Sequence, residues 1–362
     1  MQLDFHYCCV KTLAHFAGFD PEDAETIGYA SQYVDDACEH KPLRVAKLPS
    51  LFRGTGSRWF DPTCTAWNGI NYLRTFFTDV QRKVFIPFHF LPGRRFQTHH
   101  DPRRMMVLPG STFSEDLVRV ALKPFAEPNL RERRDDWQAA LIGLGIALHT
   151  YADTFSHRGF SGRRNYHENH RWAVRVWQNG CWKSKIHWLN SFFIPSIGHA
   201  SAWVYPDQPV TKWSDRRDLR GRFREYRNQI LALNGARRIF LFLQQAHGDA
   251  LREWTQIKGN ILQALTISSG QKSHQQQMLW AKQFPSLQYQ YDPKTWRREG
   301  MSGPVHWEFW PGFFYGIPRF EFAGGHKFFH FHVEARKQRL WVLEQVAHHP
   351  SLLGTGINNP FR

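Results

Sequence analysis

The chain lacks the sequence features of several common protein classes. Its five cysteines form no Cys-x-x-Cys pair and are odd in number, which disfavours a disulfide framework and favours a reducing compartment. No apolar run approaches the roughly 18 residues that a membrane span requires, and the N-terminal MQLDFHYCCVKTLAHF lacks the basic-then-apolar order of a signal peptide. There is no Gly-rich phosphate loop and no Gly-x-Ser-x-Gly motif. We therefore expect a soluble, cytoplasmic protein, with signal-independent export left open.

The composition indicates a globular protein with anionic partners. Hydrophobic residues make up 42% of the 362 residues and charged residues 22%, which is typical of a folded chain with a substantial core. The formal net charge is +16, so nucleic acid, phosphorylated small molecules and anionic membrane surfaces are the favoured partners. The chain is also rich in histidine, with 20 residues, which indicates metal or proton chemistry.

Hydrophobic periodicity predicts one mostly helical domain. Asp20 and Pro21 are a typical N-cap and first helical residue, and Thr112 with Glu115 predicts a capping box. Residues 1–270 are expected to form a helical metal-binding bundle, on which an aromatic-rich C-terminal extension, 271–362, packs as part of the same domain. The predicted helices are 3–17, 21–40, 112–122, a helix starting near Arg134, parts of 163–190, 216–245, 247–267 and 328–346; residues 285–326 are a long ordered loop or a small β element.

The stretch from Ala139 to Gly162 carries the strongest functional signal. Its apolar run is typical of a buried helix, yet His149, Asp153 and His157 follow at i, i+4 and i+8, on one helix face. A single histidine on an apolar face is usually a core residue, but a core gains nothing from three polar residues in this register. Burying two imidazoles and a carboxylate is costly unless a charged group lies among them. A transition metal, most often zinc, suits this ligand set.

Other histidines and carboxylates lie in apolar or constrained surroundings. Asp35 and Asp36 stand near the C-terminal end of a predicted helix, where an acidic residue opposes the helix dipole by about 0.3–1 kcal/mol. At least one of them is therefore expected to have another use. Because four ligands fill a tetrahedral zinc site, the whole set predicts two or three metal ions with a carboxylate bridging a pair. The further candidate ligands are Asp4, His6, His89, His199 and Asp207.

Five short sequence segments resemble those of a known family. MQLDFHY, YASQYVDDA, FHFLPG, ALHTYADTFSHRGFSG and GHASAWVYPD are similar to an uncharacterised bacterial family related to the zinc-dependent phospholipase C and P1-type nuclease superfamily. The resemblance spans roughly residues 1–210, and its most specific part is His-x-x-x-Asp-x-x-x-His followed by the Gly-His and Pro-Asp pairs. Members of that superfamily are all-α enzymes with a trinuclear zinc site. The resemblance implies the same fold and two or three Zn²⁺ ions here.

The resemblance also implies roles for individual residues. His149 and Asp153 match the pair on the central helix of the superfamily, in which the aspartate bridges two zinc ions. His89 matches the histidine after the second helix. Asp35 or Asp36 matches the single aspartate that completes the first site and that is also proposed as general base.

The remaining implied ligands depart from the superfamily pattern. His6 matches the histidine of the first helix, beside which the secreted enzymes use a processed N-terminal amino group, and Asp4 can substitute for that group here. A later histidine, His199, serves a separate zinc ion, but Trp203 stands where the secreted enzymes carry a glutamate, so Asp207 can replace it. His157 and His199 match the two histidines that bind this separate zinc ion in the superfamily. The spacing from Asp153 to His157 is shorter than the usual one there.

These features favour a metal-dependent phosphoester hydrolase. Two metal ions would clamp a phosphodiester and activate water for in-line attack on phosphorus. We expect a phospholipase-C-like enzyme with an anionic phosphate-containing substrate, a phospholipid or a nucleotide. The alternatives are a P1-type nuclease and a non-enzymatic interaction protein that a metal stabilises. Arginines that can hold the phosphate oxygens, or that can equally be solvated surface charges, are Arg158, Arg163 and Arg164.

Two further segments have less specific patterns. DRRDLRGRFREYR, residues 215–227, is basic with two aromatics, as a nucleic-acid or phospholipid patch is, but its interspersed acidic residues favour a salt-bridged helix face. In HKFFHFHVEAR only His326 and His330 share a helical face, so we expect core and rim positions there rather than metal ligands.

Overall fold

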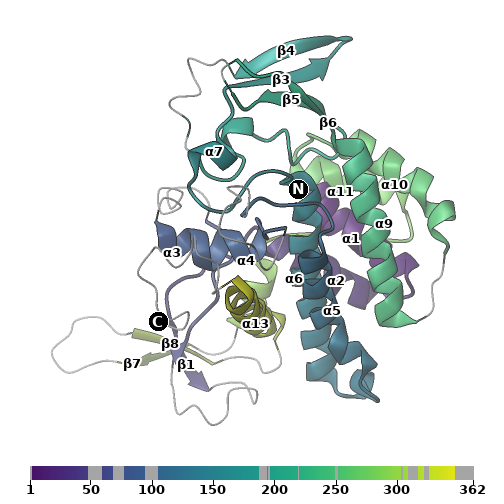
Figure 1. The fold of residues 1–362 in the computed structure, drawn as a ribbon. Helices are drawn as coiled ribbons and strands as arrows, with labels where there is room; N and C mark the ends of the chain where they lie inside the picture. The colour runs from purple at the N-terminus through teal and green to yellow at the C-terminus, as the bar shows by residue number, and fades with distance from the viewer. Residues whose placement is uncertain are drawn as a thin grey trace.

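Helices dominate the fold, and two four-stranded sheets lie at its periphery (Figure 1). A computed structural model describes residues 2–47, 59–67, 77–93, 105–186, 194, 196–218, 220–248, 252–302, 305–308, 317–321 and 326–346. The helices are η1 Asp4–Cys9 and η4 Gln81–Phe85 (both π-helical), α1 Val10–Phe16, α2 Pro21–Tyr33, α3 Thr78–Val80, α4 Ile86–Phe88, α5 Thr112–Leu122, α6 Arg134–Ser156, α7 Tyr166–Asn169, α9 Asn228–His247, α10 Trp254–Ser268, α11 Ser273–Gln283, α12 Thr295–Gly300, α13 Lys327–Val346, and the 3-10 turns η5 Lys123–Ala126, η6 Leu130–Glu132 and η7 Ala200–Ala202. The strands are β1 Leu43–Lys47, β2 Trp59–Phe60, β3 Ala173–Gln178, β4 Cys181–Ile186, β5 Lys212–Arg216, β6 Arg224–Arg227, β7 Val305–Glu308 and β8 Ile317–Glu321.

Helix α6 is the central element of the core. Residues 144–156 are buried without interruption, because helices α2, α5, α9 and α13 pack around α6. Gly145 permits the close approach of α2, since a Cβ atom there would lie 2.5 Å from the Ile27 carbonyl oxygen. The end of α2, and Asp35 just beyond it, are thereby held against the His149 turn of α6.

Several predicted helices are confirmed. The side chain of Asp20 caps α2 and accepts hydrogen bonds from the backbone amides of Glu22 and Asp23. The motif helix begins at Arg134, and the closing helix is α13. The predicted capping box at Thr112 is wrong by one residue, because Ser111 is the N-cap of α5 and accepts from the Ser114 amide.

The prediction of an all-α multi-helix bundle is wrong, because the fold is mixed. Strands β4-β3-β5-β6 form an antiparallel sheet where the sequence predicted helical pieces within 163–190 and a helix from residue 216. The long helix predicted there begins only at Asn228. The basic segment 215–227 is therefore not a helix face: it comprises the end of β5, a connection and β6.

The local sequence explains this sheet. Val174 and Val176 are buried and flank the less buried Arg175, which is the two-residue period of a strand. Asn179 and Gly180 follow with φ of 52° and 76°, and two positive φ angles are what a type I′ hairpin turn requires. The second sheet, β2-β1-β8-β7, pairs β1 with β8 in parallel, and its other pairs are antiparallel. Its strands β7 and β8 lie within residues 285–326, for which the sequence left a long ordered loop or a small β element open, and they agree with the second alternative.

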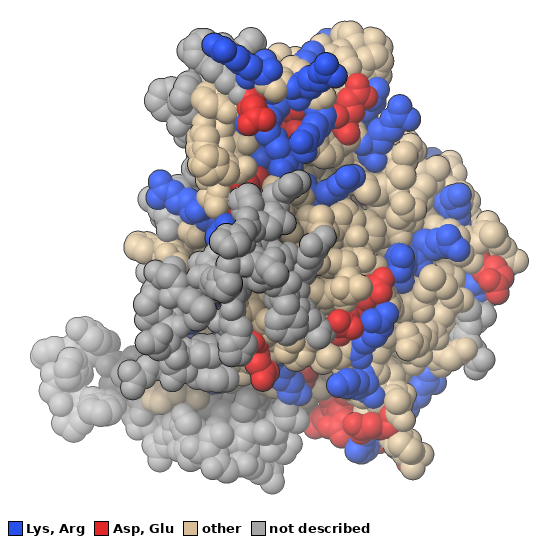
Figure 2. Space-filling view, viewed as in Figure 1, with Lys and Arg blue, Asp and Glu red and all other residues tan. Residues whose placement is uncertain are grey.

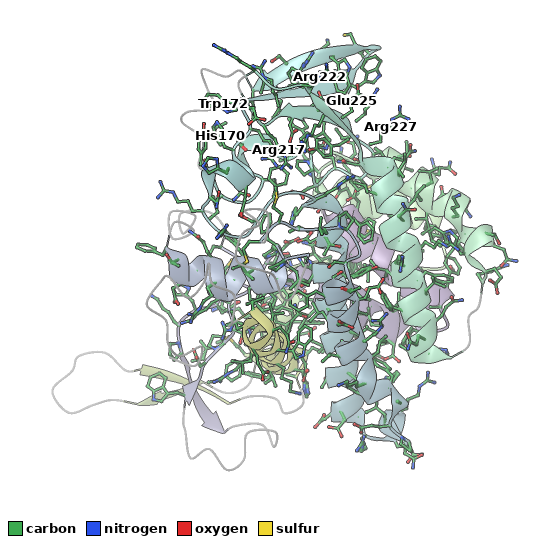
Figure 3. The ribbon with its side chains drawn as sticks, viewed as in Figure 1. His170, Trp172, Arg217, Arg222, Glu225 and Arg227 are labelled. Atoms are coloured by element: carbon green, nitrogen blue, oxygen red, sulfur yellow. The ribbon has the colours of Figure 1, made fainter. Side chains whose placement is uncertain are left out.

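A buried ion pair attaches the β4-β3-β5-β6 sheet to the end of α6. The Arg171 guanidinium is fully buried and pairs with the equally buried Asp215. Its Nη2 donates to the Gly159 carbonyl at 3.1 Å, and Arg217 Nη2 donates to the same oxygen at 3.1 Å. Figure 3 shows Arg217 on the side of the sheet that faces the helices. The sheet is thus fixed to the chain that follows α6.

Two expectations about the whole chain can be compared with the structure. No helix among the described residues is both long enough and apolar enough to span a bilayer. None of the five cysteines forms a disulfide with a described residue, in agreement with the expectation from their number and spacing.

Candidate metal centre

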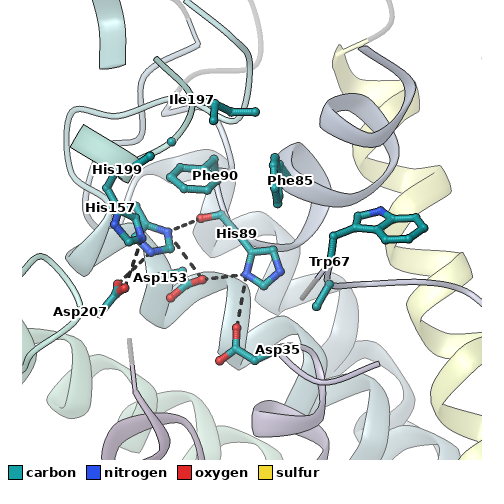
Figure 4. Close-up of a pocket in the computed structure, with 13 residues that line it drawn as sticks. Asp35, Trp67, Phe85, His89, Phe90, Asp153, His157, Ile197, His199 and Asp207 are labelled. Atoms are coloured by element: carbon teal, nitrogen blue, oxygen red, sulfur yellow. Dashed lines mark hydrogen bonds and ion pairs between the residues drawn. The ribbon is translucent and has the colours of Figure 1, made fainter. Parts of the chain in front are cut away.

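Histidine and aspartate side chains from five parts of the chain converge at the C-terminal half of α6 (Figure 4). Helix α6 supplies His149 and Asp153. His157, which the sequence placed on the same helix, is instead the C-cap residue one position beyond it. The π-helix η1 supplies His6, His89 follows α4, Asp35 follows α2, and the β4–β5 connection supplies His199 and Asp207.

The first group contains Asp35, His89, His149 and Asp153. His89 Nδ1 lies 3.2 Å from Asp153 Oδ2 and 3.2 Å from His149 Nε2. Asp153 Oδ2 lies 3.3 Å from His149 Nε2, and Asp35 Oδ1 lies 3.7 Å from both ring nitrogens. Zinc bonds of about 2.0–2.2 Å in a tetrahedron put ligand atoms about 3.3–3.6 Å apart. The five separations, 3.2–3.7 Å, lie close to this range, so these side chains are candidate ligands of one metal ion.

Hydrogen bonding alone does not satisfy this group. His89 Nε2 is 2.8 Å from the Thr65 carbonyl oxygen, which can only accept, so Nε2 carries the proton. In a neutral ring the His89 Nδ1 lone pair then points at two carboxylate oxygens. A cation among these atoms removes the repulsion, and the backbone carbonyl is the usual outer partner of a metal-bound histidine.

The second group contains His157, His199 and Asp207 and has the same organisation. His157 Nδ1 donates to the His89 carbonyl at 2.7 Å, and His199 Nδ1 donates to the Trp203 carbonyl at 2.8 Å. The free nitrogens of both rings face the Asp207 carboxylate: His157 Nε2 lies 3.0 Å from Oδ1 and His199 Nε2 lies 3.2 Å from Oδ2. Two oriented imidazoles and a carboxylate are three typical zinc ligands.

The third group, His6, His149 and Asp153, is less complete. His6 Nε2 lies 3.1 Å from Asp153 Oδ1, on the opposite oxygen from the one that faces His89. The His6 and His149 rings stack with centroids 3.9 Å apart, and neither Nδ1 has a hydrogen-bond partner in the described part of the chain. Asp153 thus belongs to two groups, one through each oxygen.

Electrostatics in the centre follow from burial and from these contacts. Burial opposes the ionised form of Asp153, yet His157, His149 and His6 hold the pKa of its carboxyl well below the ordinary value. Burial likewise opposes the charge of Asp207, but His199 keeps its pKa well below the ordinary value. The centre therefore keeps two buried carboxylates ionised, and a metal ion can replace the protons of the imidazoles that face them.

An open cavity gives access to the first two groups. It has a volume of about 230 Å³ and is lined by Asp35, His89, Asp153, His157, His199 and Asp207, together with aromatic walls from Trp67, Phe85 and Phe90. Figure 4 shows the histidines and aspartates on one side of this cavity and the aromatic rings around it. Catalytic metal sites keep an accessible coordination position, whereas structural sites are closed. The cavity is therefore suited to a small ligand at the metal groups.

Asp4 and Asp36, both predicted as ligands, lie in other surroundings. Asp4 is fully buried and its Oδ2 accepts from Ser268 Oγ at 3.4 Å, and burial raises its pKa to about 7. Asp36 accepts a 2.6 Å hydrogen bond from the Tyr291 hydroxyl, and burial raises its pKa to about 6. Of the two neighbouring aspartates that the sequence left open, Asp35 is the one in the cluster.

The three predicted substrate-binding arginines do not line the cavity in the described structure. Arg158 is exposed, one residue beyond His157. Arg163 forms an ion pair with the buried Glu168, and the exposed Arg164 donates its backbone amide to Gln81 Oε1.

Sequence reasoning missed the walls and the supports of the site. Trp67, Phe85 and Phe90 stand in segments with weak periodicity, and nothing in their local sequence indicates that they meet. Trp203 supports His199 through its carbonyl and has φ 57° and ψ −141°, a conformation that is strained for a residue with a side chain. The departure from the superfamily at Trp203 was the available signal, because it marked a change in how His199 is held.

Comparison with known proteins places the chain in a family. Residues 1–346 match a family of unknown function (DUF6765), and the chain belongs to that family. Nothing among curated proteins and nothing among solved structures matches it.

Proposed function

We propose that this member of a family of unknown function is a metal-dependent phosphoester hydrolase of the phospholipase C type, with zinc at two or three positions. The observation that carries the proposal is the convergence of Asp35, His89, His149 and Asp153 at tetrahedral ligand separations beside an open cavity. Nitrogen and carboxylate ligands in this geometry are typical of zinc. In this proposal the protein is a cytoplasmic enzyme, and its substrate is a phosphate ester.

The residues of the chain have separate roles in this proposal. Bound metal ions would polarise a phosphoryl group and activate water. The ligands would be the three groups described above, with the two oxygens of Asp153 directed at His89 and at His6. Trp67, Phe85 and Phe90 would restrict the entry of water around the substrate. Asp35 is the candidate general base, because its partly exposed carboxylate lines the cavity. Its Oδ1 faces the histidines, so the proton would go to Oδ2, which lies 3.4 Å from Gln32 Nε2.

The test is hydrolysis of a chromogenic phosphodiester, bis(p-nitrophenyl) phosphate, by the zinc-loaded protein. Turnover that a chelator abolishes and that added zinc restores would support the proposal. Asp153→Asn should abolish this turnover, whereas Asp36→Asn, which alters a partly buried carboxylate outside the cluster, should retain it. A fully loaded protein without turnover of phosphodiesters or phosphomonoesters would instead favour the metal-stabilised interaction protein.

A P1-type nuclease is the second candidate, and the β4-β3-β5-β6 sheet favours it. Figure 2 shows Lys and Arg gathered over this sheet at the top of the molecule. Lys212 Nζ lies 4.6 Å from the ring centroid of the exposed Trp177 and 5.0 Å from that of Trp182. Cations beside aromatic rings suit the phosphates and bases of a single strand. Within the described residues, four exposed arginines form no ion pair: Arg220, Arg222, Arg224 and Arg227.

Cleavage assays distinguish the two candidates. The zinc-loaded protein would be incubated in parallel with a single-stranded oligonucleotide and with phosphatidylcholine vesicles. Cleavage of the oligonucleotide that falls steeply with salt, and that Trp177→Ala with Lys212→Ala weakens, would favour the nuclease. Release of phosphocholine that is insensitive to these two substitutions would favour the phospholipase.

A further inference from the structure

A second cavity shares the Trp67 side chain with the metal-centred cavity. It is larger, about 440 Å³, and nothing in the proposed reaction uses it. Its walls are residues 61–67, the α3–η4 segment, the outer face of α13 and His40. In Figure 4 the Trp67 indole lies away from the metal cluster, on the side of the yellow helix α13. The chain between Cys64 and Trp67 therefore separates two cavities.

One part of the second cavity is apolar. Val80 and Val84 face it from the α3–η4 segment, and Leu340 and Leu343 face it from α13. On α13 the cavity-lining residues are 336, 339, 340 and 343, the i, i+3, i+4, i+7 stripe of one helix face. An apolar surface of this kind suits the hydrocarbon or aromatic part of a small molecule.

The other part of the cavity is cationic. Arg336, Arg339 and Lys83 line it, against the carboxylates of Asp61 and Asp79. Lys83 and Asp79 pair with each other at 3.1 Å, and Asp61 is exposed. The two arginines, three residues apart on α13, thus remain without a paired carboxylate in the described part of the chain.

Arg339 is the residue that lacks a partner most clearly. Its side chain is partly buried. Burial, and next the charge of Arg336, lower the pKa of its guanidinium, while the carboxylates of Asp61 and Asp79 act in the opposite direction without forming a contact. It forms no hydrogen bond or ion pair with any described residue. A guanidinium removed from water is costly unless an acceptor compensates, so such groups in proteins are normally paired. The acceptor that would complete this site is an anion from outside the described chain.

We propose that this cavity is a second binding site, which takes a small amphipathic anion. The carboxylate, sulfonate or phosphate group of the ligand pairs with Arg339, with Arg336 at the rim, and its apolar body lies on Val84 and Leu340. The guanidinium provides two parallel donors, which match a planar or tetrahedral oxyanion. The site stands on its own geometry and does not depend on the hydrolase proposal.

Isothermal titration of the full-length protein with benzenesulfonate and, separately, with sulfate tests the proposal. Benzenesulfonate should bind with one-to-one stoichiometry and more tightly than sulfate, because only benzenesulfonate covers the apolar surface. Arg339→Gln should weaken its binding by at least about tenfold, since a charge-assisted bidentate contact is lost. Arg339→Lys, which keeps the charge without the fork, should fall between the wild type and the glutamine variant.

Arg158→Gln is the matched control, because Arg158 is an exposed arginine next to the metal centre and outside this cavity. It should leave the affinity for benzenesulfonate unchanged. Thermal melting of each variant checks folding, and Arg339→Gln should melt close to the wild type, since Arg339 is only partly buried and forms no ion pair with a described residue. Absence of binding by both probes, or equal affinity of the Arg339→Gln and wild-type proteins, would overturn the proposal. So would a loss of affinity in Arg158→Gln alone.

Discussion

Asp153→Asn is the substitution that should disturb the metal centre most. One oxygen of Asp153 faces His89 and His149, and the other faces His6, so this single carboxylate contacts imidazoles of both the first and the third group. Asparagine keeps the size of the side chain and removes its charge. Loss of an outer partner of a ligand already costs about 10–100-fold in metal affinity, or about 1.4–2.8 kcal/mol. Loss of a ligand shared by two groups should exceed that cost at both.

Elemental analysis of untagged protein, purified without chelator, gives the metal content. The proposal expects up to three zinc equivalents in the wild type, one for each ligand group. Asp153→Asn should lose two of them, whereas Asp207→Asn should lose only the one held with His157 and His199. Asp36→Asn should lose none, because the Asp36 carboxylate is directed at the Tyr291 hydroxyl.

Two outcomes would refute this reasoning. If Asp36→Asn lost as much metal as Asp35→Asn, the assignment of Asp35 to the centre would be wrong. If the wild type bound no metal, the histidines and aspartates would form a polar core network, and the catalytic proposal would fail with it.

Three further predictions concern stability. Trp203→Gly should stabilise the protein by about 1 kcal/mol in urea unfolding, because glycine accepts φ 57° and ψ −141° without strain. Trp203→Ala keeps the backbone strain and should not stabilise the protein. Equal effects of the two substitutions would show that the backbone at this position is not strained. Asp215→Ala should cost about 3–5 kcal/mol in the same assay, because it leaves Arg171 buried without its partner; a loss below about 1 kcal/mol would show that the pair is dispensable. Burial lowers the pKa of His332 to about 3 from its ordinary 6.5, so the unfolded chain binds a proton that the folded chain does not. The free energy of unfolding should therefore fall by about 1.4 kcal/mol per pH unit as pH drops through this interval. In urea unfolding of His332→Gln between pH 6 and 4, the slope of this free energy against pH should be smaller by that amount. An unchanged slope would contradict the lowered pKa of His332.

The part of the site on α6 could be predicted because the sequence itself contains the geometry. His149 and Asp153 are four residues apart on one helix, so their proximity is local and the helix period gives it directly. His6, His89 and His199 were assigned through the family resemblance, since tertiary packing of separate elements brings them to α6. The choice between Asp35 and Asp36 depends on the last turn of α2, which composition and periodicity do not determine.

The sheet was missed although its signal was present. Asn179-Gly180 between two segments that contain valine, isoleucine and tryptophan is a strong hairpin indication, whereas the prediction for residues 163–190, which are rich in tryptophan and histidine, is partly helical. The segment 216–227 was assigned to a helix on its alternating charges, and Gly221 within it should have lowered that prediction. The apolar walls of the cavity could not be foreseen, because residues 67, 85 and 90 meet only through long-range packing.

The attachment of the second metal group to the sheet has a consequence for how the protein unfolds. His199 and Asp207 lie on the connection between β4 and β5, whereas His6, His149 and Asp153 belong to helices of the central core. Proteins open in cooperative segments of different free energy, and a peripheral sheet with its own small apolar cluster, separate from the main core, is such a segment. Opening of the sheet would release His199 and Asp207 together and leave the helical ligands assembled. The second metal group would then be lost before the other two as the protein opens.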